Sequence, residues 1–598
     1  MSILSNNTIK QYTLLLGILP YFFIVFIKDN TFITDIYYFI SITSILAISM
    51  LFSQIISYKK INLNITLIDL AVALLAVYFA INALFVSKIP ANHIIYRKII
   101  CFFIFLIIST HIFKIKRNIN IYLLFLIFIT IPYCILSLLK LNDPKLTQSN
   151  AFQIQFLFRN PALSAAYLGS IIPTCISFIL YSKHRLIKEV CCVSSFLILI
   201  ILFYSYSRAA WLSTVAGIVI VLLYKFDFHK ILSIAFKHSK RITLAILITI
   251  FTCSFFLLLC IFNTKPTSVY GRMLIYKLTI KGIIDKPLIG NGYETFSKSY
   301  SNIQANYFSK TGSYEPEQLL ASNNNTAFNE YLQTTFETGI IGLLGITLII
   351  IIIVKNRRII KSAETIGAMG AFISLLINAC FSYPFHSTPI LCLSITFLGI
   401  INSQYKSWII PISKQILVIS VVSMCLILII NSQNIYYLNK WKNIAELYID
   451  RDFESYSEEY FKLSKKLNAN PYFLYNYGVE LTLNGKSQEA ISILNMAKHY
   501  YIDTDLLYCL GEAYQNQNDF INAEKQFLLA WHIVPHKFYP LYRLALLYKE
   551  NGDYQKAYNM AEKILKTKEK IKSYEIDIMK NEMQILRDSL YQVYSFPK

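Results

Sequence analysis

Two arginines stand at the ends of strongly apolar segments, where a positive charge requires an anion. Arg208 lies in a short turn between two apolar runs, and Arg272 lies in the polar stretch after the next run. An unpartnered arginine inside a membrane costs about 2.5 kcal/mol or more, whereas the planar guanidinium binds phosphate groups through paired hydrogen bonds. If both arginines face the same aqueous side, they could together hold a lipid-linked diphosphate.

The elements that must position these arginines are apolar runs of membrane-spanning length. The chain has 598 residues, of which 55% are hydrophobic, and a helix needs about 20 apolar residues to cross a bilayer. This pattern predicts an all-α polytopic membrane protein with twelve or thirteen spans. The runs lie near 12–28, 35–57, 65–87, 98–113, 119–140, 161–182, 188–206, 209–224, 242–262, 339–354, 366–383, 389–404 and 414–432.

The distribution of positive charge predicts how these spans are oriented. The net charge is +22, and counting from a cytoplasmic N-terminus places nineteen lysines and arginines in short inner loops but eight in short outer loops. Such a bias is a positive-inside signal. It predicts that Arg208, the polar stretch 263–338 and the chain after residue 432 lie outside the cytoplasm. Topology and contact with membrane lipids therefore explain the charge, and we expect no nucleic-acid partner.

The segment 433–598 carries a sequence repeat. Small residues recur at intervals of 33 and 34, namely Gly478, Gly511 and Ala545, and likewise Ala490, Ala523 and Ala557. The interval and the small residues resemble tetratricopeptide repeats, in which paired helices approach closely. We therefore expect a membrane domain at 1–432 and a periplasmic α-solenoid at 433–598. Such a solenoid usually binds a protein or peptide in its concave groove.

The predicted outer stretch 263–338 is longer than a plain connection. Loops of more than about 15 residues are usually functional or disordered. This one contains a turn-rich segment at 285–293, together with aromatic residues and helical periodicity. We expect it to form an ordered lid over the membrane domain.

Four segments carry a resemblance to a known family. They are Phe158-Arg159-Asn160-Pro161, Ser207-Arg208-Ala209-Ala210-Trp211, Gly271-Arg272 with 286–292, and Asn329-Glu330-Tyr331-Leu332-Gln333 followed by Glu337-Thr338-Gly339-Ile340-Ile341-Gly342. In this order and spacing they resemble the O-antigen ligase superfamily, which includes lipopolysaccharide O-antigen ligases, protein O-oligosaccharyltransferases and related polymerases. The resemblance extends over roughly residues 150–400, and a tetratricopeptide tail also occurs in some members.

The resemblance implies a GT-C-like helical membrane fold and a transfer reaction. A glycan on a polyprenyl-diphosphate carrier is moved, with no metal or other cofactor, to a hydroxyl of a lipid A core or protein acceptor outside the bacterial inner membrane. Arg208 and Arg272 match the arginines that the family uses on the leaving diphosphate. By the same resemblance, Arg159, Asn329 and Tyr383 would contact substrate, although Tyr383 also fits an interfacial anchor.

The residue that would activate the acceptor hydroxyl departs from the family pattern. Many members carry a histidine directly before the Asn329-Glu330 pair, and Phe328 stands there in this sequence. Two other residues could accept the proton. His386 lies in the predicted outer loop that follows residue 383, and histidine titrates near neutrality; Glu330 lies in the motif itself. The sequence leaves open which of them acts.

Three other functions fit parts of the sequence. A polysaccharide polymerase of the same superfamily would use a second lipid-linked chain as acceptor. A transporter with the repeats as a scaffold would show repeated halves and mid-membrane charges. Asp69 is the best such charge, but it lies near the inner end of its run, and the halves show no evident similarity. The absent histidine also fits an inert membrane anchor for the repeats.

Overall fold

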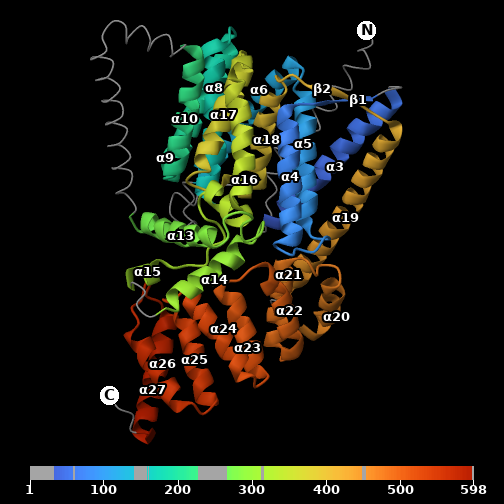
Figure 1. Ribbon diagram of the computed structural model, residues 1–598. Helices are drawn as coiled ribbons and strands as arrows, with labels where there is room; N and C mark the ends of the chain where they lie inside the picture. The colour runs from blue at the N-terminus through green and yellow to red at the C-terminus, as the bar shows by residue number, and fades with distance from the viewer. Residues whose placement is uncertain are drawn as a thin grey trace, which may run out of the picture.

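The protein consists of a bundle of apolar helices joined to a stack of shorter helices (Figure 1). The computed structural model describes residues 32–57, 61–140, 158, 160–226, 266–310, 315–447 and 453–594. The bundle occupies the upper part of Figure 1 and the stack the lower part. We call the end of the bundle that faces the stack the repeat-side end, and the opposite end the far end.

Within the described residues, nine helices are long and apolar enough to cross a membrane. They are α3 (Phe32–Ser57), α4 (Leu67–Phe85), α5 (Ile94–Ile112), α6 (Lys116–Leu139), α8 (Pro161–Tyr181), α9 (Arg185–Ser205), α10 (Arg208–Lys225), α16 (Glu330–Lys355) and α19 (Lys414–Leu447). Two shorter apolar helices are α17 (Ala363–Asn378) and α18 (Thr388–Asn402). The prediction of an all-α polytopic membrane protein is confirmed. Eleven predicted runs coincide with these helices, and the runs 12–28 and 242–262 lie outside the described residues.

Small residues let three of these helices pack closely. A Cβ atom on Gly217 of α10 would lie 2.6 Å from the carbonyl oxygen of Gly370 in α17, and one on Gly169 of α8 would lie 2.3 Å from Thr214 Oγ1 in α10. Close backbone approach through small residues is a common way to associate helices in a membrane. This packing fixes the start of α10, which carries Arg208, relative to α8 and α17.

A short antiparallel sheet joins two segments that the sequence did not predict as strands. Strand β1 (Ile61–Ile65) pairs with β2 (Trp408–Ile412), with Leu63 opposite Ile410. Both strands lie at the far end (Figure 1). Both segments are rich in isoleucine, which favours strands, but the partners are more than 300 residues apart, so only the fold brings them together.

The basic loops that the charge pattern predicted as cytoplasmic meet at the far end. Tyr224 at the end of α10 donates to the carbonyl of Arg357 at 3.2 Å, and Lys114 before α6 donates to Ser407 Oγ at 3.1 Å. Loops that are far apart in the sequence therefore share one face. The stack of helices lies at the other end of the bundle (Figure 1).

The described part of the stretch 263–338 is folded into helices. These are α13 (Pro266–Asp285), α14 (Phe296–Phe308) and α15 (Glu315–Leu320). They share an apolar cluster that includes Leu278, Tyr300 and Phe336. Phe336 belongs to α16, which begins at Glu330 rather than at the predicted residue 339. Gly339 has a non-helical backbone conformation and kinks α16. The apolar part of the helix therefore begins where the run 339–354 predicts it, and the polar turns before the kink were not predicted.

The stack contains a first helix, three consecutive helix pairs and a terminal helix. Its helices are α20 (Phe453–Ser464), α21 (Pro471–Leu483), α22 (Ser487–Tyr500), α23 (Thr504–Asn516), α24 (Phe520–Ile533), α25 (Phe538–Glu550), α26 (Tyr554–Lys566) and α27 (Tyr574–Tyr594). A Cβ atom on Gly478 would lie 2.5 Å from Leu494 of the paired helix, and one on Gly511 would lie 2.5 Å from Phe527. The repeated small residues therefore lie where paired helices touch. Their identification with tetratricopeptide repeats stays a prediction.

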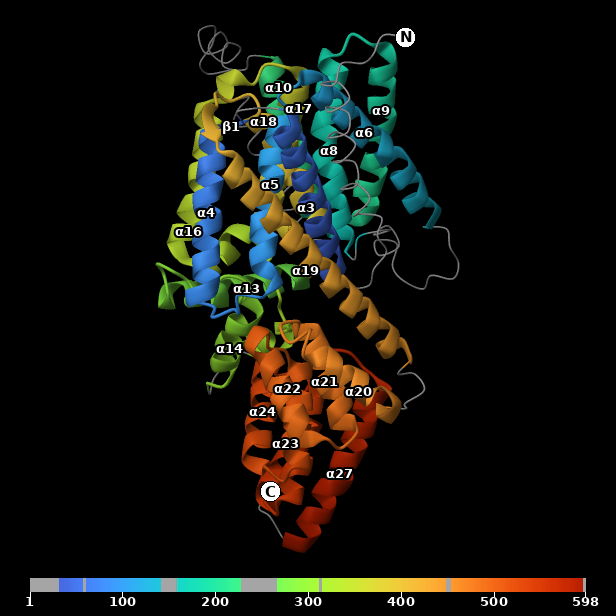
Figure 2. The ribbon, with the colours of Figure 1, turned by 90° about the vertical axis from the view of Figure 1, so that its right-hand side faces the viewer.

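Helix α19 extends from the bundle into contact with the stack (Figure 2). It runs from Lys414 to Leu447, so the expected domain boundary at 432/433 falls inside a helix. Leu438 and Ile444 near its end are buried against the stack, and Trp441 Nε1 donates to Asn476 Oδ1 at 2.8 Å. The helix continues past the apolar run because its polar end still packs on a folded neighbour.

Helix α14 holds the stack against the bundle. Ser301 donates to the carbonyl of Ile502 at 3.0 Å, and Gln304 Nε2 donates to the carbonyl of Ile533 at 2.6 Å. Ala305 is buried in an apolar cluster with both isoleucines. The stack is therefore attached to the helices that border the repeat-side end of the bundle.

Candidate functional site

The loop between α17 and α18, residues 379–387, connects most of the site residues that the sequence singled out. It includes a short 3-10 helix, Pro384–His386, at the repeat-side end. Its members contact Arg272 on one side and Glu330 on the other. Residues from α8, α13, α16 and the loop before α16 therefore converge on one nine-residue segment.

Arg272 of α13 is held in place by two contacts. Its Nη1 donates to the carbonyl of Phe381 at 2.8 Å, and its guanidinium lies 5.0 Å from the centre of the Phe328 ring. Burial lowers the pKa of Arg272, the Tyr276 hydroxyl opposes this, and the positive charge of Arg208 lowers the pKa further. The two arginines are therefore close enough to repel each other. An anion that contacts Arg272 would relieve the cost of its burial.

Arg208 is the first residue of α10 and is partly buried. The turn before it is tight, because Tyr206 adopts a left-handed conformation with φ of 50°. Trp211 Nε1 donates to the carbonyl of Leu202 at 2.7 Å and ties α10 back to α9. A helix N-terminus carries a partial positive charge and favours anions. The position therefore adds to the attraction that the arginine itself exerts on an anion.

Phe328 occupies the position where the family pattern has a histidine, and its ring packs beside the guanidinium of Arg272. The ring also meets Tyr383 edge-on, with centroids 5.3 Å apart, and the Phe328 carbonyl accepts from the Tyr276 hydroxyl at 3.2 Å. Its φ is 53°, a region that costs a non-glycine residue about 1 kcal/mol or more and that the surrounding contacts maintain. At this position the chain holds the arginine and supplies no base.

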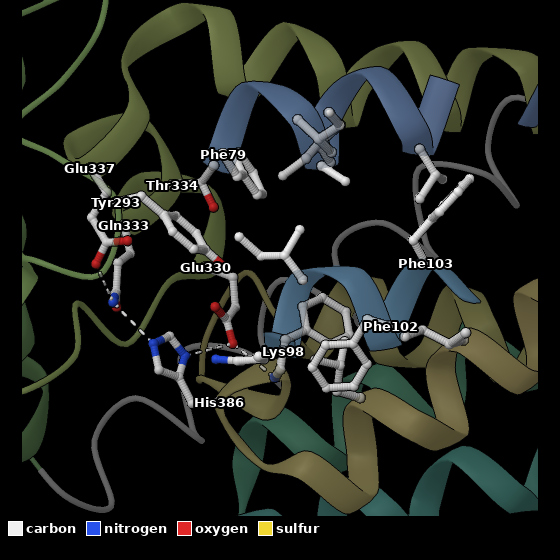
Figure 3. A pocket seen from close by; sticks show the side chains of 18 of the residues that line it. Phe79, Lys98, Phe102, Phe103, Tyr293, Glu330, Gln333, Thr334, Glu337 and His386 are labelled. Atoms are coloured by element: carbon white, nitrogen blue, oxygen red, sulfur yellow. Dashed lines mark hydrogen bonds and ion pairs between the residues drawn. The ribbon is translucent and has the colours of Figure 1, made fainter. Parts of the chain in front are cut away.

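His386 and Glu330, the two candidate bases, form a single pair (Figure 3). His386 Nδ1 lies 3.2 Å from Glu330 Oε1, which also accepts from the backbone N–H of Phe385 at 2.8 Å. The backbone N–H of Glu330 in turn donates to the carbonyl of Ala379 at 2.9 Å. The carboxylate thus fixes the imidazole orientation, while 35% of the His386 side chain stays exposed. This is the arrangement of a base with an orienting carboxylate.

The charge around His386 is dominated by carboxylates. Burial alone would lower the His386 pKa, but the carboxylates of Glu330, Glu294 and Glu337 outweigh it and raise the pKa to about 9. Burial would likewise raise the pKa of Glu294, but the ammonium group of Lys98, with Nζ 2.7 Å from Glu294 Oε1, lowers it. The site therefore holds an anionic cluster beside a histidine that attracts a proton.

Gln333 links His386 to this cluster (Figure 3). Its Nε2 lies 3.0 Å from His386 Nε2 and donates to Glu337 Oε1 at 3.1 Å. Its Oε1 accepts from the backbone N–H of Ala327 at 3.0 Å, so the amide orientation is fixed from both sides. Glu337 Oε2 accepts from the backbone N–H of Glu294 at 2.9 Å. A continuous polar chain therefore runs from Lys98 to Glu330.

Two glycines bring the cluster together. A Cβ atom on Gly339 would lie 2.0 Å from the carbonyl oxygen of Leu288, and one on Gly290 would lie 2.4 Å from the carbonyl oxygen of Glu337. Both glycines have positive φ, 67° and 73°, which other residues rarely adopt. The segment 286–292 thus lies directly on the kink of α16. This contact places Glu294 beside Glu337.

A cavity of about 310 Å³ opens beside the His386–Glu330 pair (Figure 3). One end is polar, with His386, Glu330 and Glu294. The remaining walls are apolar and come from α4, α5, α16 and α18, with Phe79 and Phe102 among them. Pockets with apolar walls and a few converging polar groups are the usual form of a small-molecule site. This one suits a molecule with a polar group at one end and an apolar remainder.

The other predicted site residues have different positions. Arg159 lies outside the described residues. Asn329 caps α16, because its Oδ1 accepts from the backbone N–H of Leu332 at 2.9 Å. Tyr383 accepts a hydrogen bond at its hydroxyl from Asn160 Nδ2, at 2.7 Å. Asn160 thus ties the start of α8 to the loop 379–387.

Sequence reasoning missed Lys98, Glu294, Gln333 and Glu337. Glu337 lies seven residues after Glu330 in the same motif, a spacing that puts both on one helix face, and this signal was present. Lys98 stands at the start of an apolar run and was counted only as a topological charge. Across the described segments, no three His, Cys, Asp or Glu side chains are arranged to hold a metal ion.

The comparison with protein families agrees with the motif reading. Residues 193–347 match the family described as O-antigen ligase. The matched segment includes Arg208, Arg272 and Glu330, and it ends before His386. No curated protein matches the chain. The match supports the O-antigen ligase superfamily, and with the nine apolar helices it fits a multi-pass membrane protein of the ligase or polymerase type.

Proposed function

We propose that this protein is a membrane glycosyltransferase that moves a glycan from a polyprenyl-diphosphate carrier to an acceptor hydroxyl. One observation carries the proposal. Arg272, which feels the charge of Arg208, and a histidine–carboxylate pair both contact the same loop, at one end of a bundle of membrane-spanning length. Lipid-linked diphosphate and an activated hydroxyl are the two requirements of such a transfer, and each side of the loop meets one of them.

The arginine side would handle the leaving group. When the bond between the anomeric carbon and the diphosphate oxygen breaks, the electron pair stays on that oxygen, and the negative charge grows. Arg208 and Arg272 would stabilise this charge, and the N-terminus of α10 would add to their effect. The contacts of Arg272 with Phe381 and Phe328 hold its guanidinium in a fixed position, so little reorganisation is needed during the reaction.

The histidine side would activate the acceptor. The acceptor hydroxyl would displace the Gln333 amide from His386 Nε2. Its oxygen then forms a bond with the anomeric carbon, and its proton passes to Nε2. Glu330 holds the imidazole through Nδ1 and stabilises the imidazolium that results. Attack from the face opposite the diphosphate would invert the anomeric configuration. Retention of configuration, measured by NMR of the product, would refute this direction of attack.

The charge distribution supports a location outside the cytoplasm for the reaction. Basic loops meet at the far end, and the arginine pair and the stack belong to the repeat-side end. With the positive-inside bias, this arrangement supports a cytoplasmic N-terminus and a periplasmic stack at a bacterial inner membrane. Labelling of cysteines introduced at Lys225 and at Tyr554 with a membrane-impermeant reagent tests it, since only the second should react in intact spheroplasts.

The decisive experiment measures release of the carrier. Purified full-length protein is incubated with a polyprenyl-diphosphate glycan and an acceptor, and free polyprenyl diphosphate is quantified. Arg208→Ala should reduce release by about 100-fold or more, as loss of a charge-stabilising donor does in other enzymes. Arg185→Ala is the control, because Arg185 is 91% exposed and pairs with Glu189 in α9. Wild-type rates in Arg208→Ala would reject the proposal.

The acceptor separates a ligase from a polymerase. In a strain that lacks the protein, gel profiles of surface glycans distinguish the two. Loss of long-chain ladders from the lipid-linked pool identifies a polymerase, in which the acceptor is a second lipid-linked chain. Accumulation of unattached lipid-linked polymer identifies a ligase, in which the acceptor is a glycolipid or a protein. We propose the ligase.

A further inference from the structure

The stack of helices carries tyrosines at a repeated position. Each lies three residues before the small residue that marks the repeat and therefore occupies the same place on the first helix of its pair. These tyrosines are Tyr475, Tyr508 and Tyr542, at intervals of 33 and 34. Residues at equivalent positions of stacked repeats lie in a row. The stack thus presents one tyrosine per repeat along α21, α23 and α25.

Neighbouring tyrosines widen this row. The ring of Tyr539 lies 4.4 Å from that of Tyr508 and 6.1 Å from that of Tyr542, measured between centroids. At the other end, the ring of Tyr501 lies 6.4 Å from that of Tyr475. Three of these rings, those of Tyr475, Tyr508 and Tyr539, line one groove of about 520 Å³ between α21, α23, α25 and α27. The groove is an aromatic surface that is open to solvent.

The charges beside the tyrosines are balanced. Lys537 Nζ lies 3.0 Å from Asp505 Oδ1, and Arg543 Nη2 lies 3.2 Å from Glu512 Oε1. These two cations are therefore already paired. The other charged residues of the groove lining, Lys570 and Glu575, are one of each sign, so the groove carries no excess charge to attract an acidic peptide. What it offers is aromatic faces with hydroxyl, carboxylate and ammonium groups at their edges.

We propose that this groove binds a glycan chain, the substrate or product of the proposed transfer. The face of a sugar ring presents C–H bonds that carry partial positive charge, and the face of a tyrosine ring is electron-rich. The hydroxyl groups around the sugar match the polar rim. Tyrosine also supplies a large contact area at a low cost in side-chain entropy. An acidic or basic peptide, by contrast, would favour an excess of one charge, which the lining of this groove does not have.

The lining of the groove contacts the segment of chain that leads to the candidate site. Thr504, which lines the groove, accepts at Oγ1 from Asn323 Nδ2 at 2.8 Å, and His536 Nδ1, also in the lining, lies 2.9 Å from the carbonyl oxygen of Gln318. Asn323 stands five residues before Phe328, the residue that holds Arg272. The stack extends away from the bundle (Figure 1). A glycan whose diphosphate end lies at the arginines would therefore leave the membrane along the tyrosines.

The test uses full-length protein in detergent and oligosaccharides released by mild acid from the lipid-linked glycans of cells that make the protein. The oligosaccharides are labelled at the reducing end, and binding is followed by fluorescence polarisation. The double variant Tyr508→Ala, Tyr539→Ala should bind about tenfold more weakly, because two aromatic contacts are lost. Tyr554→Ala should bind as the wild type does, because Tyr554, 36% exposed against 37% for Tyr539, begins α26 and lies outside the groove. Circular dichroism confirms that each variant is folded.

The inference rests on the proposed function, but the two can fail separately. Arg208→Ala should reduce transfer by about 100-fold or more and leave oligosaccharide binding unchanged. That result supports both the proposed function and the glycan-binding groove. Absence of transfer by the wild type, together with tyrosine-dependent oligosaccharide binding, rejects the function and retains the groove. Equal binding by the wild type and the double variant, or no binding by either, overturns the groove. A peptide from an acceptor-protein array that binds in a tyrosine-dependent manner, where oligosaccharides do not, assigns the groove to a protein partner and also overturns it.

Discussion

The two sides of the loop 379–387 carry opposite charge. On one side, Arg272 lies among aromatic rings and close enough to Arg208 for their charges to repel. On the other, Glu330 belongs to a cluster of three carboxylates around His386, with Lys98 bound to Glu294. A diphosphate is attracted to the first side and repelled by the second. We infer from this difference that the proposed donor and acceptor would bind on separate sides of the loop.

The largest expected effect concerns the histidine side. His386→Ala removes the base and should reduce transfer by about 100- to 10,000-fold, while the affinity for the polyprenyl-diphosphate donor stays within about twofold because the arginine side is intact. Single-turnover transfer and donor binding, measured on the same preparation, check this. A parallel loss of donor affinity would show that the two sides are not separate.

Loss of the arginine contact ranks next. Arg272→Ala should reduce kcat/KM by about 100- to 1,000-fold, because a preorganised charge on the leaving group is lost. Arg272→Lys keeps the charge but not the paired geometry, so it should recover only part of the rate. Carrier release is the measurement. Full recovery of carrier release in the lysine variant would show that the arginine side supplies positive charge alone and that the contact with Phe381 is irrelevant.

The pH dependence follows from the carboxylates around His386. Their charge raises the His386 pKa to about 9, and a base must be unprotonated to act. We therefore expect kcat/KM to rise about tenfold per pH unit from pH 7 and to level off near pH 9. Glu330→Gln removes one of these charges and should move the rising limb to lower pH. A flat profile between pH 7 and 9 would assign the proton to Glu330.

The sequence singled out the arginines, His386 and Glu330, because each stands out by type and position, and their roles stay predictions. It did not identify the cluster, since Glu294 and Glu337 are brought together by the contact of Gly290 with the kink at Gly339. Such backbone contacts are tertiary and leave no local pattern. The same limit applies to the strand pair, whereas the apolar helices were predictable because hydropathy alone defines them. Even there, the start of α16 at Glu330 was missed, as a polar first turn hides the helix.

The smallest effect is expected at Phe328. The family pattern has a histidine at this position, whereas the structure shows a phenylalanine ring beside the guanidinium of Arg272. Phe328→Leu removes the ring over Arg272 and should weaken donor use by about three- to tenfold, the value of one cation–π contact. The loss should appear in KM for the donor and not in the rising pH limb, because the ring is remote from the proton. Phe328→Tyr keeps an aromatic ring over Arg272, so its KM for the donor should stay close to that of the wild type. Phe328→His should not rescue His386→Ala, since that side chain faces an arginine and not the carboxylate that must orient a base. Rescue by Phe328→His would mean that both sides of the loop can supply the base and that the charge separation does not divide the chemistry.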